Sequence, residues 1–166
     1  MGMRPSFTSE TIRALLVEAA GSTQEVCGLL RGTGDRIETA QPARNLAADP
    51  ARHFEIDPAA LLKAYRDARG GGAAVLGCYH SHPSGSAYPS PTDAAQAAAD
   101  GRLWLIIGGG TARLWRAVAN GERHGRFDPV RFDVIEAGHV ENNCEAVQMD
   151  ISGRTMTFGA AQGSSL

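Results

Sequence analysis

The chain has 166 residues, a formal net charge of −2 and three cysteines, and 43% of its residues are hydrophobic. A chain of this length can bury the core of one domain without disulfides as staples. Its 16 lysines and arginines are scattered and are balanced by 18 aspartates and glutamates, which argues against a nucleic-acid-binding surface.

The cysteines and the distribution of apolar residues indicate the cellular compartment in which the protein is expected. Cys27, Cys78 and Cys144 are odd in number and form no Cys-x-x-Cys, so a disulfide framework is not expected. The first eight residues lack an apolar signal core, and no apolar run approaches membrane-spanning length. We therefore expect a soluble, cytoplasmic protein that acts on a protein or peptide and not on nucleic acid or membrane. Its oligomeric state stays open.

Helical spacing of apolar residues indicates two helices in the first half of the chain. The first begins at a capping residue, Thr8 or Ser9, and ends at Gly21. The second begins at Asp57 and Pro58, which suit an N-cap and a first helical position, and it ends at the glycines 70–72.

Apolar runs bounded by turn residues predict the strands. In chain order the predicted strands cover residues 25–31, 36–40, 53–56, 73–80, 103–107, 112–119 and 145–151. The run 103–107 is apolar throughout and predicts a central strand, and Asn120-Gly121 predicts a hairpin turn. Together these elements predict an α/β fold, with a mixed β-sheet flanked by helices.

The stretch from His80 to Asp93 holds two imidazoles, a hydroxyl and a carboxylate. Side chains two apart on a strand share a face, so His80 and His82 should point together. Asp93 falls in the first turn of a helix predicted at 94–99, and a loop rich in Gly, Pro and Ser can bring it back to the imidazoles. Two histidines and one aspartate leave a fourth zinc position for water, the open arrangement of a catalytic site.

Each part of this stretch also has a structural interpretation. His-x-His alone is a weak metal signal, and Ser-Pro-Thr-Asp is also a capping box with Ser90 as N-cap. Taken alone, Glu25 is a solvated charge at a strand end. Cys78 shares a strand face with His80, but a free cysteine usually packs as a small hydrophobic residue. The other histidines have no partner at ligand spacing and are expected to be ordinary: His53, His124 and His139.

The spacing His-Ser-His, seven residues, Ser, two residues, Asp resembles the JAMM signature of the MPN (Mov34/PAD-1) zinc metallopeptidase family. The family's upstream motif, Glu-x-Cys-Gly-Leu-Leu, is matched at residues 25–30. The resemblance runs from about residue 8 to about residue 136 and implies the JAMM/MPN (cytidine deaminase-like) fold. It implies Zn2+ held by His80, His82 and Asp93, Glu25 as general acid/base, and Ser90 as a stabiliser of the tetrahedral intermediate.

The resemblance also implies a substrate class. Compact prokaryotic members of the family resemble peptidases that process small ubiquitin-like sulfur carriers. We therefore predict a zinc-dependent peptidase or isopeptidase that cuts after the C-terminal glycine of such a carrier. Two alternatives remain: a RadC-like JAMM protein of unclear chemistry, whose His-Pro-Ser-Gly is matched at residues 82–85, and a non-catalytic MPN scaffold. Residues 1–136 should form the metallopeptidase domain, and residues 137–166 a C-terminal extension with one strand and a disordered tail.

Overall fold

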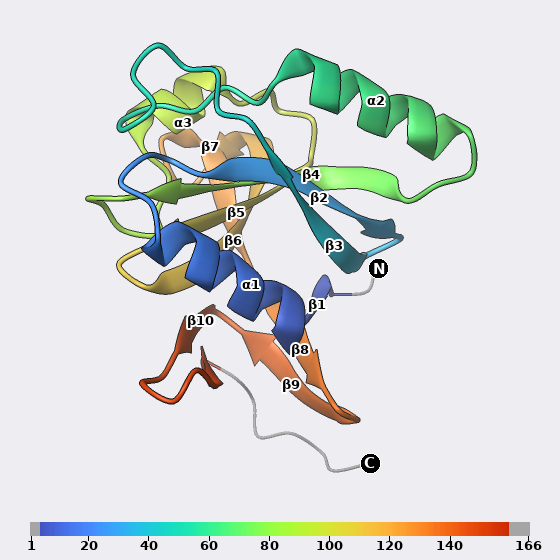
Figure 1. Cartoon of the computed structure of the whole chain (residues 1–166), viewed down its shortest axis with the longest axis vertical. Helices are drawn as coiled ribbons and strands as arrows, with labels where there is room; N and C mark the ends of the chain where they lie inside the picture. Colours follow the sequence, from blue (N-terminus) through green and yellow to red (C-terminus); the bar gives the residue numbers. More distant parts are fainter. Residues whose placement is uncertain (1–3, 160–166) are drawn as a thin grey trace.

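The computed structural model describes residues 4–159, which form three helices and one mixed sheet (Figure 1). The helices are α1 (Ser9–Ala20), α2 (Pro58–Arg69) and α3 (Pro91–Gln96). The strands are β1 (Ser6–Thr8), β2 (Cys27–Thr33), β3 (Arg36–Ala43), β4 (Ala74–His82), β5 (Leu103–Gly108), β6 (Thr111–Gly121), β7 (Gly125–Val130), β8 (Phe132–Glu136), β9 (His139–Cys144), β10 (Ala146–Met149) and β11 (Thr155–Phe158). The predicted mixed sheet with flanking helices is confirmed.

The strand that carries the two histidines lies inside the sheet. The strands pair in the order β11-β10-β6-β5-β4-β2-β3-β1-β8-β9, and β7 pairs with β6. On β4, His80 is opposite Cys27 of the antiparallel β2 and opposite Ile106 of the parallel β5. Pairing on both sides fixes the register of β4, and therefore the direction of every side chain on it.

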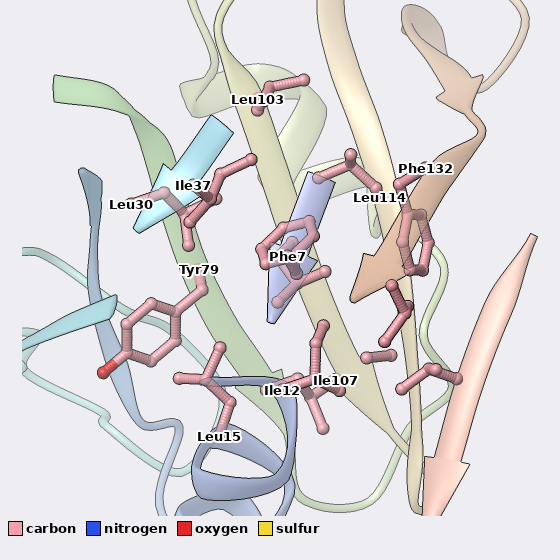
Figure 2. Packing of buried hydrophobic residues seen from close by; sticks show 14 of the residues in the cluster. Phe7, Ile12, Leu15, Leu30, Ile37, Tyr79, Leu103, Ile107, Leu114 and Phe132 are labelled. Carbon is pink, nitrogen blue, oxygen red and sulfur yellow. The ribbon is translucent and has the colours of Figure 1, made fainter. Parts of the chain in front are cut away.

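Helix α1 covers one face of the sheet and closes the main core. The Thr8 hydroxyl accepts a hydrogen bond from the Thr11 amide at 3.1 Å, which caps the first turn as predicted. The buried apolar side of the helix, with Ile12 and Leu15, packs near Tyr79 of β4 and Ile107 of β5 (Figure 2). Full burial of such side chains contributes about 1.5–3 kcal/mol each. This core anchors β4 from the α1 side.

The opposite face of β4 lies under α2 and α3. There Leu61 and Tyr65 of α2 line an apolar cavity of about 410 Å³ together with Cys78 and Trp104. Beside it, a second cluster packs Ile106, Trp115, Ala117 and Phe127 against the end of α3. Successive residues of β4 thus alternate between a closed apolar core and a more open face.

Two glycines permit close approaches that the site requires. A Cβ on Gly28 would lie 2.5 Å from the Tyr79 ring, so this position in the Glu-x-Cys-Gly-Leu-Leu stretch makes room for the core tyrosine. A Cβ on Gly108 would lie 2.4 Å from the Ser86 backbone. Gly108 therefore lets the loop after β4 pack onto β5.

Some predicted elements differ from the observed ones. Residues 53–56 form no strand but only an isolated bridge between Ile56 and Asn45, and α3 ends at Gln96 rather than at residue 99. No range was predicted for strand β7, and its hairpin with β6 turns after Gly121 rather than at Asn120-Gly121, because β6 continues through both of these residues. Strand β7 forms because β6 offers a free edge, where Trp115 pairs with Pro129.

The segment beyond residue 136 continues the same sheet as far as it is described. Strand β10 lies within the strand predicted at 145–151, and β9 and β11 flank it. Strand β9 pairs with β8 and β10 pairs with β6. Residues 160–166 of the predicted tail lie outside the described residues, and the division at residue 136 stays a prediction. Within residues 4–159, every helix is too short or too polar to cross a membrane.

Candidate metal centre

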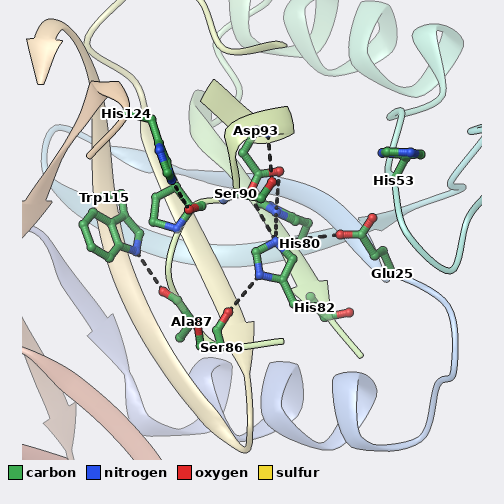
Figure 3. A network of polar contacts seen from close by, with 12 residues as sticks. Glu25, His53, His80, His82, Ser86, Ala87, Ser90, Asp93, Trp115 and His124 are labelled. Carbon is green, nitrogen blue, oxygen red and sulfur yellow. Dashed lines mark hydrogen bonds and ion pairs between the residues drawn. The ribbon is translucent and has the colours of Figure 1, made fainter. Parts of the chain in front are cut away.

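The fold brings all five predicted site residues together at one end of β4 (Figure 3). His80 and His82 are at the C-terminal end of β4, and Asp93 is in the first turn of α3. Glu25 lies two residues before β2, and Ser90 is the N-cap of α3. Residues from three separate parts of the chain therefore converge on one buried spot.

The donor atoms of the two histidines and the aspartate form a tight triangle. His80 Nε2 lies 3.1 Å from His82 Nε2, and Asp93 Oδ1 and Oδ2 lie 3.1 Å from the Nε2 atoms of His80 and His82 respectively. Tetrahedral zinc with bonds of about 2.0–2.1 Å to N and O separates its ligand atoms by about 3.3–3.4 Å. The observed spacing fits one zinc ion held by these three side chains.

The hydrogen bond on the far side of His82 directs its lone pair toward the triangle. His82 Nδ1 lies 2.8 Å from the Ser86 carbonyl oxygen, which can only accept, so Nδ1 carries a proton. In a neutral imidazole this leaves Nε2 as an acceptor facing the Asp93 carboxylate. The lone pair of His82 Nε2 and the Asp93 carboxylate then lie 3.1 Å apart, and a cation held close to both would stabilise this arrangement. The donor set therefore suits a metal ion.

Burial and hydrogen bonding shift the pKa values of the triangle in opposite directions. Burial lowers the pKa of His80, which only the contact with Asp93 opposes, so His80 is held neutral as a metal ligand requires. Burial alone would raise the pKa of Asp93, but the close contacts with His80 and His82 and the hydrogen bond from the Ser90 amide outweigh it and lower that pKa well below its usual range. Burial lowers and Asp93 raises the pKa of His82, with a net upward shift.

Aromatic contacts orient His80. The Phe54 ring stacks on the imidazole at 4.1 Å between centroids, with an angle of 18° between planes, and the Trp104 ring meets its edge at 5.7 Å. His80 Nδ1 has no hydrogen-bond partner within the described residues. At metal sites a hydrogen bond to the second ring nitrogen usually orients a histidine ligand, and here the Phe54 ring orients His80 by stacking.

Glu25 lies just outside the triangle. Its Oε1 is 3.8 Å from His82 Nε2, and the whole residue is only 4% exposed. Its Oε2 has no hydrogen-bond partner among the described residues. Burial, only partly opposed by His82, raises the Glu25 pKa to about 7. Glu25, His80 and His82 also form a metal-compatible group with ligand atoms within 4.8 Å of one another, but the contact of Glu25 is longer than the 3.1 Å contacts of the triangle.

Ser90 forms the predicted capping box. Its hydroxyl oxygen accepts from the Asp93 amide at 3.0 Å, and its own amide donates to Asp93 Oδ2 at 2.9 Å. The capping interpretation is therefore confirmed, and the same contacts fix the Asp93 carboxylate. The hydroxyl proton of Ser90 stays free for another acceptor in the adjoining space.

A cavity of about 450 Å³ opens beside the triangle. It is lined by Glu25, Ala51, Arg52, His82, Pro83, Ser84, Gly85, Ser86, Tyr88, Pro89, Ser90 and Arg123. Cys78 is not among them: it lines the apolar cavity under α2, and burial raises the pKa of its thiol, so it behaves as the expected packing residue. The triangle is therefore closed by protein on the Phe54 side and open on the Glu25 side.

Asn45 supports the site but was not identified from the sequence. The Asn45 side-chain amide donates to the carbonyl oxygens of Glu25 and His53, both at 2.9 Å, and its oxygen accepts from the amides of Ala47 and Glu55. This residue fixes the backbone of Glu25, although nothing in its polar loop distinguishes it from a turn residue.

The histidines predicted to be ordinary are not part of the triangle. His124 lies on the β6–β7 turn, and its Nε2 is 3.1 Å from the Pro89 carbonyl oxygen next to Ser90 (Figure 3). His139 contacts Glu141 at 2.7 Å on the surface. His124 thus supports the loop of the site without being a ligand, a role that depends on a contact 35 residues apart in sequence.

Comparisons with known proteins place these residues in a wider context. A family profile, prokaryotic homologs of the JAB domain, matches residues 8–118. The protein Desampylase from Haloferax volcanii is 36% identical over 96 residues, which cover 55% of this chain and 69% of that protein.

Solved structures agree on the fold. A solution structure of a protein from Desulfitobacterium hafniense has a TM-score of 0.66 and 29% identity, covering 79% of this chain and 92% of that one. A crystal structure of a JAB1/MPN domain protein from Archaeoglobus fulgidus has a TM-score of 0.52 and 22% identity, covering 81% and 100%. The segment matched by the family profile contains all five residues predicted for the site.

Proposed function

Because this chain belongs to the family of prokaryotic homologs of the JAB domain, we propose that it is a zinc-dependent peptidase or isopeptidase. Its substrate in this proposal is a small ubiquitin-like carrier protein, cut after the C-terminal glycine. The observation that carries the proposal is the triangle of 3.1 Å contacts among His80, His82 and Asp93, with Glu25 on its open side. Similarity to a protein named Desampylase supports an enzyme rather than a scaffold.

In this proposal His80, His82 and Asp93 hold the ion. Zinc bound there would lower the pKa of a water to about 7 and polarise the scissile carbonyl. The Ser86 carbonyl keeps His82 in the tautomer that presents Nε2, and the Phe54 ring holds the plane of His80. Both contacts position the ligands before any substrate arrives.

In this proposal Glu25 moves the proton. It accepts a proton from the attacking water as the water oxygen joins the carbonyl carbon of the terminal glycine. The C–N bond then breaks, and the proton passes from Glu25 to the leaving amine, which yields a carboxylate and an amine. Two hydrogen bonds hold the Glu25 backbone during both proton transfers. The Asn45 side-chain amide donates to the Glu25 carbonyl oxygen at 2.9 Å, and the Glu25 amide donates to the Pro50 carbonyl oxygen at 2.7 Å.

In this proposal Ser90 stabilises the carbonyl oxygen as it gains negative charge. Its hydroxyl oxygen accepts from the Asp93 amide, and its proton can rotate toward the adjoining cavity, which Ser90 lines. One such donor contributes about 2.7–4 kcal/mol to the transition state in other enzymes. Capping and catalysis then use different parts of the same hydroxyl.

The remaining parts of the proposal concern the chain around the site. We assign catalysis to residues 1–136 and treat 137–166 as a C-terminal extension. Cys27, Cys78 and Cys144 are free thiols, which supports a reducing, cytoplasmic compartment. Neither nucleic acid nor membrane is a partner in this proposal.

Incubation with carrier adducts tests the proposal. The zinc-loaded protein is mixed with a ubiquitin-like carrier from the same organism whose terminal Gly-Gly is joined to an amino acid, and intact masses are followed over time. We expect loss of the mass of the attached residue, and no loss with Glu25→Gln as the matched control. A zinc-loaded protein that cleaves no such adduct but cleaves unrelated peptides would overturn the substrate assignment.

A further inference from the structure

The tip of the β6–β7 hairpin reaches the rim of the metal-site cavity. Arg123 of this tip lines the cavity together with Glu25, His82 and Ser90. The tip lies beyond residues 8–118, so it is outside the segment matched by the family profile. The family match therefore says nothing about what Arg123 does at the site.

Several contacts hold Arg123 in place. Its guanidinium carbon lies 4.4 Å from the centre of the Tyr88 ring, in the loop after β4. Its backbone amide donates to the Phe127 carbonyl at 2.8 Å, and the neighbouring His124 contacts the Pro89 carbonyl at 3.1 Å. His124 adopts a φ of 52°, a left-handed conformation that turns the chain at the tip. The guanidinium is thus attached to the same loop that shapes the site.

Arg123 forms no ion pair with another side chain in the described part of the chain. No carboxylate within residues 4–159 lies within 4 Å of its guanidinium. Among the described residues that line the cavity, Glu25 is the only acid, and Arg52 adds a second positive charge. The contact of Arg52 with Asp49 is long, 3.9 Å, and highly exposed. The cavity rim is therefore suited to an anionic group.

We propose that Arg123 binds the free α-carboxylate of a single amino acid attached to the carrier's terminal glycine. The inference rests on the proposed function and narrows its substrate class. An amino acid joined through its α-amine has its carboxylate two bonds from the scissile nitrogen, so this anion enters the cavity beside the metal site. A protein lysine joined through its side chain has no carboxylate there. The guanidinium fork matches a carboxylate with two parallel hydrogen bonds.

The other arginine on Tyr88 provides a matched control. Arg113 lies 4.9 Å from the same ring and lines a neighbouring cavity of about 350 Å³. Arg123 lines both cavities, whereas Arg113 does not line the one that holds Glu25 and His82. Arg113→Gln removes the same charge and the same kind of ring contact as Arg123→Gln. Only Arg123→Gln removes a charge from the metal-site cavity.

Binding without turnover is the first measurement. Carrier proteins ending in Gly-Gly-Ala, either as the free acid or as the carboxamide, are titrated calorimetrically into zinc-loaded Glu25→Gln protein. We expect the acid to bind about 10- to 100-fold more tightly, the range of a charge-assisted hydrogen-bonded pair. Adding Arg123→Gln should erase this ratio, whereas adding Arg113→Gln should preserve it.

Turnover of the same two adducts is the second measurement. In the active protein, Arg123→Gln should lower kcat/KM for the acid by about 10- to 100-fold and leave the amide unchanged, and Arg123→Lys should restore part of the preference. The inference would be overturned if the Glu25→Gln protein bound the acid and the amide equally tightly. It would also be overturned if Arg123→Gln lowered kcat/KM equally for both adducts. If neither adduct is cleaved, the proposed function fails, and the calorimetric ratio still decides the role of Arg123.

Discussion

The two faces of β4 differ in what they bury. On the α1 face Tyr79 is fully buried among apolar side chains (Figure 2). Its hydroxyl donates to Glu18 at 3.1 Å. On the other face His80 is equally buried, but its neighbours include Asp93 and His82 (Figure 3). One strand therefore supports a core with one set of alternate residues and a polar site with the other.

The difference between the two faces of β4 shows that one face mainly stabilises the fold and the other carries the candidate site. Buried polar groups without partners cost roughly 1–3 kcal/mol each in proteins, and unpartnered atoms of His80 and Glu25 are on the site face. The apolar face provides the stability that tolerates this cost. Changes on the site face should therefore remove metal and activity, whereas changes on the α1 face should reduce stability and leave the metal.

The largest effect is expected from the metal ligands. His80→Ala, His82→Ala and Asp93→Ala should each remove most of the zinc from a protein that otherwise holds about one ion, because the 3.1 Å triangle loses a corner. Metal analysis after dialysis against a mild chelator measures this, and circular dichroism checks the fold. Full zinc retention in all three variants would show that the ion lies elsewhere.

Glu25→Gln should separate metal binding from chemistry. The amide keeps the size of the side chain but cannot accept the proton, so hydrolysis should fall about 10²- to 10⁴-fold while zinc content stays unchanged. Single-turnover cleavage of a carrier adduct, with zinc measured on the same sample, tests this. Nearly normal cleavage by the variant would mean that another group is the base.

Ser90→Ala should lower both the stability of the fold and the rate of hydrolysis. Loss of the cap should lower the free energy of unfolding by about 1 kcal/mol, and loss of the hydroxyl donor should lower kcat about 10²- to 10³-fold. Ser90→Asp is a useful comparison, because aspartate also caps a helix but cannot donate. If Ser90→Asp restores stability without activity, the two roles are distinct; if it restores both, the donor role is wrong.

The smallest effect is expected on the α1 face. Tyr79→Phe keeps the packing but removes the hydrogen bond to Glu18, which should cost about 1 kcal/mol and leave the zinc in place. Burial raises the Glu18 pKa and the Tyr79 hydroxyl lowers it, so the variant should raise that pKa further. A group with a raised pKa in the folded state stabilises below its unfolded pKa, and this contribution is lost as pH rises.

The stability difference between the native protein and Tyr79→Phe should therefore be small in acid and grow as pH increases through the Glu18 titration. Urea unfolding at a series of pH values, with the native protein as reference, measures the difference. A difference that does not depend on pH would show that the Glu18 carboxylate is not the group affected.

Residue patterns were sufficient where a feature depends on near neighbours. The caps at Thr8 and Asp57 and the capping box at Ser90 were predicted, because a cap is a contact between residues two or three positions apart. The shared direction of His80 and His82 was predicted for the same reason, since it follows from the period of a strand. The strand predicted at residues 53–56 was wrong and strand β7 was not predicted, because pairing with distant residues decides both.

Local patterns in the sequence were enough to predict the mixed sheet and the residues that meet at the candidate site, since motif spacing and the period of a strand are local properties. How that site is supported depends on tertiary contacts: Phe54 stacked on His80, Asn45 bound to the Glu25 backbone, and Arg123 over the Tyr88 ring. Each of these contacts joins segments far apart in the chain. Which residues meet in these contacts depends on how strands and loops pack together, and a local sequence pattern does not contain that information.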